Sequence, residues 1–267
     1  MPDVYVSIAT AEEAVQERLA EVLELRAAEP AQQAMLEAYL ADVPLPDGAR
    51  VLEVGCGTGV VARTVAARPG VGEVVGLDPS PVFVDRARQL AENVANVSYV
   101  VGSGTALPFQ DGAFDAVILH TVLSHILDAE TALAEAARVT AAGGALAVFD
   151  GDYATTTVAL GDHDPLQACA EAAMAALVHD RYLVRRLGTL VRAAGWEVVR
   201  LRSHGYVENE EPGYILTLID RGADTLVGAG SLGEPAAAAL KAEARRRVAA
   251  GRFFGHIAYA SLIARRP

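Results

Sequence analysis

The sequence predicts an α/β fold built around a mostly parallel β-sheet. Short apolar runs of strand length alternate with helical patterns along much of the chain, a rhythm that is typical of βαβ units. One of these runs ends in closely spaced glycines that lead into a helix. Apolar residues make up 52% of the 267 residues, which is too many for a disordered chain. No apolar run reaches the roughly 18 residues that a membrane-spanning helix needs, so no membrane insertion is expected.

Two amphipathic helices are predicted ahead of the sheet. Apolar side chains recur at helical spacing over residues 11–27, and the pattern returns over 35–40, after Pro30. We therefore expect residues 1–47 to form an N-terminal helical extension.

The first part of the sheet is predicted to span residues 48–150. Its strands are expected at 50–54, 73–77, 97–101, 115–119 and 144–149. Ser80 followed by a proline is a typical helix start, because serine caps the first turn and proline fits the first helical position. The glycine pair at 143–144 is expected to close the helix that precedes the last of these strands.

The remainder of the chain, 151–267, is predicted to complete the sheet and to cover it. Helical patterns fall at 166–178, 182–194, 213–226 and 234–249, and strand patterns at 196–201 and 256–263. The final strand is expected to be antiparallel, at or near an edge. Residues 151–195 and 204–253 are expected to form a lid over the carboxyl end of the sheet. No linker or internal repeat divides the chain, so residues 1–267 are predicted to form a single domain.

Charge and cysteine content exclude several classes of function. The chain has 22 Lys and Arg against 34 Asp and Glu, a net charge of −12, and phosphate backbones and anionic lipids repel such a chain. Neither nucleic acid nor a membrane is therefore expected as a partner. Cys56 and Cys169 form no CxxC pair, so no cysteine-based metal site is predicted. The first residues lack a basic segment followed by an apolar core, so a cytoplasmic protein is expected; the oligomeric state stays open.

The strand at 50–54 opens through Gly55, Gly57 and Gly59 into a helix. Glycine permits positive φ and lets the backbone come close to a ligand, while the first turn of the helix offers free N–H groups. Asp78, nineteen residues beyond Gly59, ends the next predicted strand. An acid at this place can accept hydrogen bonds from both hydroxyls of a ribose. The alternative is an acid that only caps the helix starting near Ser80.

Four segments together carry a family resemblance. They are EVGCGTG at 53–59, GLDPS at 76–80, ALPF at 106–109 and FDAV at 114–117. In this order and spacing they resemble the class I S-adenosylmethionine-dependent methyltransferases, in particular the branch that includes the ubiquinone and menaquinone methyltransferases and many small-molecule enzymes. The match covers residues 48–150. The resemblance implies a Rossmann-like seven-stranded, mostly parallel sheet with helices on both faces, an N-terminal helical extension, helical lid insertions and S-adenosyl-L-methionine as cofactor.

The resemblance also implies a set of cofactor-binding residues. By position they are Glu53, Gly55, Cys56, Gly57, Asp78, Pro79, Ser103, Gly104 and His120. Glu53 and the glycine backbone would hold the methionine end, Asp78 the ribose and Pro79 one face of the adenine. The family commonly has an acid where Ser103 stands. Recognition of the adenine is therefore expected to shift toward the backbone of Gly104.

Methyl transfer needs an in-line nucleophile held close to the methyl carbon, and a base only when the acceptor carries a proton. His120 follows a strand directly and is the first candidate for that base, although it could equally contact the methionine end through its backbone. His125, Asp150, Asp152 and Tyr153 are the candidates that line the acceptor pocket. For His125 the alternative is a histidine packed under a helix, and for the two acids it is a solvated loop.

Other polar clusters have plainer explanations. Residues 162–164, Asp-His-Asp, have the composition of a metal site, but neighbours in an extended stretch point apart, and no metal is expected. The arginines within 181–192 and 245–247 indicate solvated or ion-paired helix faces, with an anionic acceptor as the alternative. Apolar residues around Tyr214 either line an acceptor pocket or pack on the sheet.

The function predicted from these residues is methyl transfer from S-adenosyl-L-methionine to a small-molecule acceptor, in secondary or quinone-type metabolism. The alternative is a protein of the same fold that binds the cofactor but catalyses a non-methylating cyclisation or rearrangement. A nicotinamide-dependent dehydrogenase would favour GxGxxG over the GxGxG spacing present here. A scaffold protein without cofactor affinity would not need Glu53, Asp78 and the glycines together. The lid carries no motif that specifies the acceptor atom.

Overall fold

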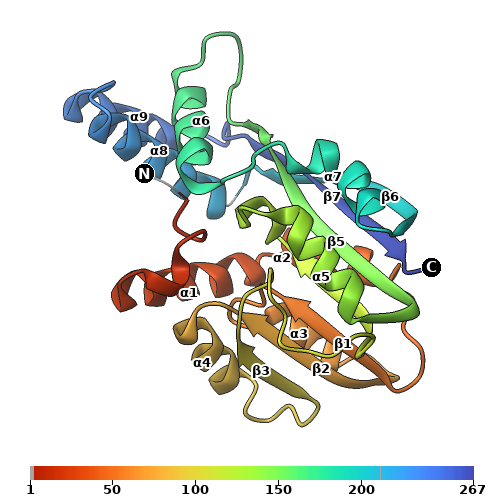
Figure 1. The fold of residues 1–267 in the computed structure, drawn as a ribbon. Coiled ribbons are helices and arrows are strands. Elements are labelled where there is room, and N and C mark those ends of the chain that lie inside the picture. The colour runs from red at the N-terminus through yellow and green to blue at the C-terminus, as the bar shows by residue number, and fades with distance from the viewer. Residues whose placement is uncertain (1–2, 211) are drawn as a thin grey trace.

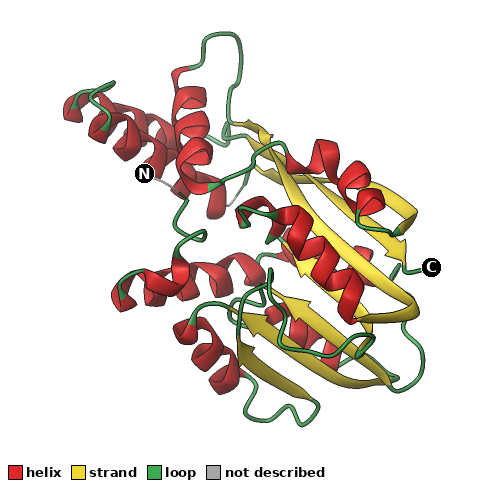
Figure 2. Cartoon of the chain, in the orientation of Figure 1, coloured by secondary structure: helices red, strands yellow, loops and turns green. Residues whose placement is uncertain are grey.

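The computed structural model describes residues 3–210 and 212–267, which form a seven-stranded sheet with helices on both faces (Figures 1 and 2). The strand order is β3-β2-β1-β4-β5-β7-β6. The strands are β1 (Ala49–Val54), β2 (Val71–Asp78), β3 (Val97–Val101), β4 (Phe114–His120), β5 (Thr140–Thr157), β6 (Glu197–Glu208) and β7 (Gly255–Arg265). The predicted Rossmann-like fold class is therefore confirmed.

The final strand runs against its neighbours, as predicted. β1 to β5 pair in parallel, whereas β7 pairs antiparallel with both β5 and β6. Ser261 of β7 lies opposite Phe149 of β5 on one side and Arg202 of β6 on the other. β7 is thus the second strand from the edge.

Two apolar layers separate the sheet from its helices. The helices of these layers are α2 (Pro30–Leu40), α3 (Val60–Ala66), α4 (Pro81–Leu90), α5 (Ala129–Val139) and α7 (Leu183–Ala193). On one face, Leu133 of α5 and Leu187 of α7 pack in one cluster with Leu52 of β1. On the other, Tyr39 of α2 and Val61 of α3 belong to a second cluster. Burial on both faces explains why the parallel strands have nearly continuous apolar sequences.

The other helices gather at the carboxyl end of the parallel strands (Figure 1). They are α1 (Glu13–Ala28), α6 (Pro165–Leu177), α8 (Tyr214–Gly228) and α9 (Glu234–Ala249). α8 crosses α6 so closely that a Cβ on Gly222 would fall 1.7 Å from the carbonyl oxygen of Cys169. The expectation that all of 151–195 forms a lid is wrong for α7, because its apolar face, with Val191 fully buried, packs on the sheet.

β5 and β6 are longer than the sequence indicates. β5 was expected to end at Phe149 but continues to Thr157, because β7 supplies hydrogen-bonding partners beyond that point, such as Ala258 opposite Asp152. The same partner extends β6 to Glu208. No strand pattern is visible in the sequence after Phe149, because antiparallel pairing with a distant strand leaves little local signal.

The glycine pair at 143–144 does not close a helix. α5 ends at Val139, and β5 begins at the next residue, with Thr140 as the cap. Gly143 has a φ of +78° at the start of β5, close to the point where the register with β4 shifts. The predicted start of α4 is confirmed, because Oγ of Ser80 accepts a hydrogen bond from the amide N of Phe83 at 3.1 Å.

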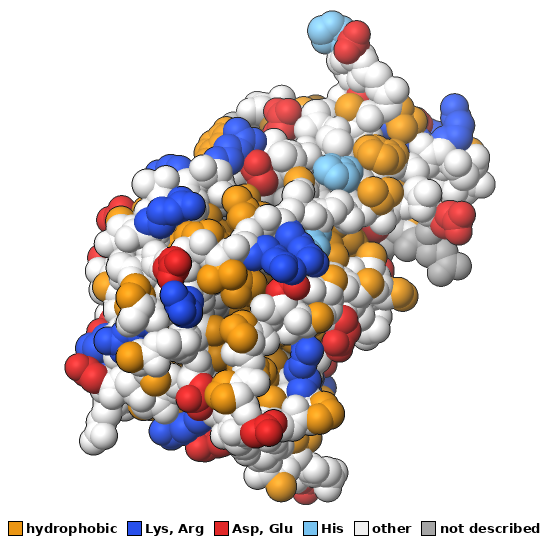
Figure 3. Space-filling view, turned by 90° about the vertical axis from the view of Figure 1, so that its right-hand side faces the viewer, with side chains coloured by type: hydrophobic (Ala, Val, Ile, Leu, Met, Phe, Trp, Pro, Cys, Tyr) orange, Lys and Arg blue, Asp and Glu red, His pale blue; other side chains and the backbone are white. Residues whose placement is uncertain are grey.

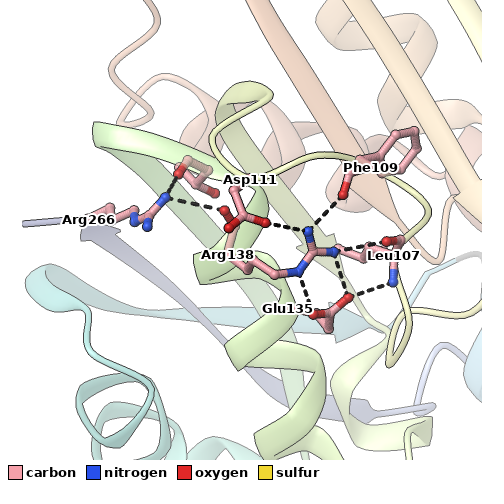
Figure 4. Close-up of polar contacts among 7 residues, drawn as sticks. Leu107, Phe109, Asp111, Glu135, Arg138 and Arg266 are labelled. Atoms are coloured by element: carbon pink, nitrogen blue, oxygen red, sulfur yellow. Dashed lines mark hydrogen bonds and ion pairs between the residues drawn. The ribbon is translucent and has the colours of Figure 1, made fainter.

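Arg138 of α5 holds the loop 102–113 between β3 and β4 against that helix (Figure 4). Its guanidinium donates to the carbonyl oxygens of Leu107 at 2.9 Å and Phe109 at 2.7 Å. Glu135 accepts from the amide N of Leu107 at 2.8 Å, and the hydrogen bonds from Arg138 hold the pKa of Glu135 below its ordinary value. The loop is thereby fixed, and its first residues line the pocket described below.

Five of the arginines within 181–192 and 245–247 are ion-paired, as one of the two interpretations expects: Arg185, Arg186, Arg245, Arg246 and Arg247. Arg185 pairs with Asp152 at 2.8 Å, and Arg247 pairs with Asp164 at 2.6 Å. In Figure 3, blue Lys and Arg side chains are interspersed with red acidic and orange apolar ones rather than gathered in one patch. Among the described residues no helix is long and apolar enough to cross a membrane, and no group of His, Cys, Asp and Glu could hold a metal ion.

Candidate active site

A pocket of about 450 Å³ opens at the carboxyl ends of β1, β2 and β4. This volume lies within the range that is usual for small-molecule sites. The glycine loop after β1 and residues 103–105 line one side, and α1, α6 and α8 line the other. The predicted residues that line the pocket are Glu53, Gly55, Cys56, Gly57, Asp78, Pro79, Ser103, Gly104, His120, His125 and Tyr153.

The glycine loop is packed so tightly that only glycine fits at positions 55 and 59. Gly55 has a φ of +71°, and a Cβ there would lie 2.2 Å from Cγ2 of Val122. Gly59 has a φ of +81°, and its Cβ would lie 2.4 Å from the hydroxyl of Tyr99. The amides of Gly55 and Cys56 donate to the carbonyl oxygen of Leu77 at 2.7 and 3.0 Å, which ties the loop to the end of β2.

Asp78 connects this loop to the start of α4. One carboxylate oxygen accepts from the amide N of Gly57 and the other from the amide N of Ser80, both at 2.9 Å. Burial raises the pKa of Asp78 to about 6, because the side chain is only 5% exposed. Each carboxylate oxygen has a second lone pair, so Asp78 can stabilise the loop and still accept a hydrogen bond from a ligand in the pocket.

Glu53 lines the pocket with an unused hydrogen-bonding atom. The side chain is 2% exposed, and its Oε2 has no hydrogen-bond partner in residues 3–210 and 212–267. Burial raises the pKa of Glu53 well above its ordinary value. A cationic donor would relieve this cost by pairing with the carboxylate. The ammonium group of the methionine end of S-adenosylmethionine is such a donor, so the residues present fit that cofactor.

Residues 52–148 match the family described as methyltransferase domain. This chain carries a methyltransferase domain. The predicted resemblance to class I S-adenosylmethionine-dependent methyltransferases is confirmed over that span. The demethylmenaquinone methyltransferase of Thermus thermophilus is 40% identical over 102 residues, which cover 38% of this chain and 46% of that protein. The chain spans about half the length of the curated relatives it matches, or less.

Solved structures agree with the fold of the methyltransferase domain. The [4+2]-cyclase SpnF aligns with a TM-score of 0.56 and 24% identity, covering 89% of this chain and 82% of that chain. Phosphoethanolamine N-methyltransferase 2 of Haemonchus contortus, in complex with S-adenosyl-L-methionine, aligns with a TM-score of 0.55 and 19% identity, covering 88% and 52%. At such identities the likeness supports the fold alone.

Ser103, which is predicted to lie near the adenine, points its hydroxyl at its own turn. Oγ of Ser103 lies 2.9 Å from Oγ1 of Thr105 and accepts from the amide N of Thr105 at 3.3 Å. Ser103 is exposed, and Gly104 lies beside it in the pocket lining. The hydroxyl is therefore partly occupied by the turn, which leaves the backbone of this segment as the more available partner.

His120 sits at the end of β4 in an apolar environment. Its ring stacks on Phe149 with centroids 4.9 Å apart, and its Nδ1 lies 3.0 Å from the hydroxyl of Tyr39. Burial, with a smaller effect of Arg26, lowers the pKa of His120 to about 3, so the ring is neutral at neutral pH. If Tyr39 donates, the ring proton lies on Nε2; in the other tautomer Nε2 is free to accept one.

His125 is oriented by a carboxylate from the N-terminal segment. Its Nδ1 lies 2.6 Å from Oδ2 of Asp3, which also accepts from the amide N of His179 at 2.9 Å. The other oxygen of Asp3 accepts from the amide N of Tyr5 at 2.9 Å. Because a carboxylate accepts, the proton of the neutral ring belongs on Nδ1, and Nε2 is the nitrogen that can take a proton. Asp3 escaped prediction because it lies 122 residues away.

The expectation that Asp150 and Asp152 line the acceptor pocket is wrong. Asp150 is fully buried and accepts from the amide N and the hydroxyl of Ser124 at 3.1 and 2.9 Å. Asp152 pairs with Arg185 outside the pocket. Both acids lie on β5, where alternate side chains point to opposite faces, and only Tyr153 of this segment reaches the pocket.

The far side of the pocket contains polar residues that the sequence did not single out. Arg26 and Gln32 come from the N-terminal helices, and Arg221 comes from α8. Arg26 lies seven residues after Leu19 and three after Leu23, on the apolar face of the predicted helix. That spacing was the signal that could have revealed it.

Proposed function

We propose that this protein transfers a methyl group from S-adenosyl-L-methionine to a small-molecule acceptor. The observation that carries the proposal is the unpaired, buried Oε2 of Glu53 beside the glycine loop of a methyltransferase domain. The pocket continues beyond this acid into a region lined by histidine and tyrosine side chains, where an acceptor can lie next to the cofactor.

Several residues of the chain would hold the cofactor, which supplies a methyl group on a positively charged sulfur. Glu53 would pair with the ammonium group, and Asp78 would accept from the ribose hydroxyls. The backbone of Gly104, together with Ser103 and Pro79, would contact the adenine. Cys56 and Gly57 contribute the backbone that faces the ligand.

Positioning of the acceptor supplies much of the rate in a direct displacement. Helices α6 and α8 line the pocket and would shield the reacting atoms from water. An acceptor with a hydroxyl or amine must also lose a proton. His120 is the base predicted from the sequence, but a group with a pKa near 3 is a weak base. We therefore assign proton removal to Nε2 of His125, which Asp3 orients, and leave His120 as a neutral neighbour of the reacting atoms.

Of the quinone-type and secondary-metabolism acceptors, the quinone type is supported by the 2-phytyl-1,4-naphtoquinone methyltransferase and the demethylmenaquinone methyltransferases among the relatives. The second candidate is a cyclisation or rearrangement without methyl transfer. The fold likeness to the [4+2]-cyclase SpnF is the reason to test it. For both candidates we propose that residues 1–267 form one domain, since residues of α1, α6 and α8 line the same pocket as residues of the segment 52–148.

The two candidates differ in what happens to the cofactor. The purified protein is incubated with S-adenosyl-L-methionine carrying a labelled methyl group and with a panel of phenols, hydroquinones and amines. Release of S-adenosylhomocysteine together with a product heavier by one methyl group is the expected result. Conversion of an acceptor while the cofactor stays unchanged would contradict methyl transfer and favour the second candidate. Glu53→Gln is the control with weakened cofactor binding, and a reaction without protein gives the background.

A further inference from the structure

Two arginines on the far side of the pocket lack carboxylate partners among the described residues, in contrast to Arg185 and Arg247. Neither Arg26 nor Arg221 takes part in an ion pair within residues 3–210 and 212–267. Nη2 of Arg26 is buried and has no hydrogen-bond partner among those residues. A buried charge without partners is unfavourable, so the site calls for a group that arrives from outside the chain.

Aromatic side chains lie around the Arg26 guanidinium, but they do not neutralise its charge as an anion would. Its Cζ lies 5.7 Å from the ring centroid of Tyr214 and 5.9 Å from that of Tyr259. Both distances are close to the outer limit of about 6 Å for attraction between a cation and a ring. Burial lowers the pKa of Arg26, but Tyr259, Tyr153 and Tyr214 together raise it above its ordinary value. The guanidinium therefore stays charged in the pocket.

The position of Arg26 places it on the acceptor side rather than the cofactor side. Two of its aromatic neighbours, Tyr153 and Tyr259, come from β5 and β7, which lie on the other side of β4 from the strands that carry Glu53 and Asp78. The charges that act on Glu53 are those of Asp78 and Arg63. Arg26 instead acts on His120, the histidine at the junction of the two sides.

We propose that Arg26, with Arg221 in the lining of the same pocket, binds an oxyanion of the methyl acceptor, a carboxylate or a phosphate group. The planar guanidinium can donate two parallel hydrogen bonds to such a group, which fixes the orientation of the acceptor as well as its charge. Tyr5, Tyr153 and Tyr214 line the same region and offer flat apolar surfaces for the acceptor's body. The identification of the ligand as the acceptor rests on the proposed function.

The test uses benzoate and phenyl phosphate as the two oxyanion probes and benzamide as a neutral probe of similar shape. Each is titrated by calorimetry into the full-length protein, with and without saturating S-adenosylhomocysteine. At least one anion is expected to bind tenfold or more tightly than benzamide, and the stronger of the two identifies the oxyanion. Arg26→Met is expected to remove that preference while affinity for S-adenosylhomocysteine stays unchanged. Arg18→Met, an exposed position on the same helix, is the matched control.

Three results would overturn the inference. Benzamide could bind to the wild-type protein as tightly as both anions do. This outcome is measured on the wild-type protein alone and requires no variant. Arg26→Met could weaken S-adenosylhomocysteine rather than the anion, which would place the guanidinium on the cofactor. Where Arg26→Met does not fold, Arg26→Gln, which removes the charge but keeps a long polar side chain, could keep the full anion preference. Failure of the wild-type protein to bind S-adenosylhomocysteine would contradict the proposed function instead. In that case the anion titration without S-adenosylhomocysteine still tests whether Arg26 binds an oxyanion.

Discussion

The two sides of the pocket are built in different ways. On the side proposed to hold the cofactor, called the cofactor side below, Glu53, Gly57 and Asp78 come from two neighbouring strands and the loop that follows the first, within 26 residues of sequence. On the acceptor side, Asp3, His125 and the arginines come from segments up to 218 residues apart, Asp3 to Arg221.

The electrostatics of the two sides differ as well. The cofactor side holds two buried acids whose pKa values burial raises, while the acceptor side holds two arginines without carboxylate partners among the described residues. A cation is expected on the first side and an anion on the second. The contrast teaches that one pocket can combine acids from β1 and β2 on one side with arginines from α1 and α8 on the other.

The largest effect is expected from the pH dependence of stability at Asp78. Burial raises the pKa of Asp78 from 3.8 to about 6, so between these values the folded chain holds a proton that the unfolded chain has lost. The stability from this proton is fully present below about pH 4 and is lost as the pH rises through 6, roughly 3 kcal/mol in all. Urea unfolding of the wild type and Asp78→Asn from pH 4 to 8 measures it. Parallel stability curves for the two proteins would contradict this prediction.

The next effect concerns the unpaired acid. Glu53→Gln keeps the shape of the side chain but removes the negative charge, and S-adenosylhomocysteine affinity is expected to fall about 30-fold, or about 2 kcal/mol. Calorimetry measures the change. Glu73→Gln, an exposed position on β2, is the control and should bind like the wild type. Unchanged affinity in Glu53→Gln would remove the distinction between the two sides.

These first two predictions concern residues that the sequence itself made visible. Closely spaced glycines, a strand of continuous apolar residues and an acid at the next strand end are local patterns, and the structure brings the residues they single out together in one pocket. The fold of the parallel strands followed from the same patterns. The length of β5 could not be predicted, because Ala258 and its neighbours determine it through antiparallel pairing.

The acceptor side depends on contacts that no local pattern records. Asp3 meets His125, and Arg26 meets Tyr259, only after the chain has folded. The acids at 150 and 152 were misassigned for a related reason: their partners, Ser124 and Arg185, lie on other elements.

A smaller effect on kcat is expected when the His125 ring loses the carboxylate that orients it. Asp3→Asn keeps a hydrogen-bonding side chain but removes the carboxylate that orients the ring, so kcat for a hydroxyl acceptor should fall about tenfold. The KM for S-adenosyl-L-methionine should not change, because Asp3 lies on the acceptor side. Steady-state kinetics separates the two parameters, with Asp85→Asn on the exposed face of α4 as the control. A rise in that KM with kcat unaffected would show that Asp3 serves the cofactor.

The smallest effect is expected at Ser103. Its hydroxyl is engaged with Thr105, so Ser103→Ala should change S-adenosylhomocysteine affinity by less than about threefold, under 0.7 kcal/mol. Calorimetry with the matched Ser98→Ala variant of β3 provides the comparison. A loss of tenfold or more would mean that the Ser103 hydroxyl, rather than the backbone, receives the adenine.

The most direct measurement is a calorimetric titration of the wild-type protein with S-adenosylhomocysteine and, separately, with NAD. An acid without a partner beside a GxGxG loop predicts that the sulfur-containing nucleoside binds and that NAD does not. Absence of binding by folded protein, or preference for NAD, would contradict the assignment of the glycine loop, Glu53 and Asp78 to the cofactor.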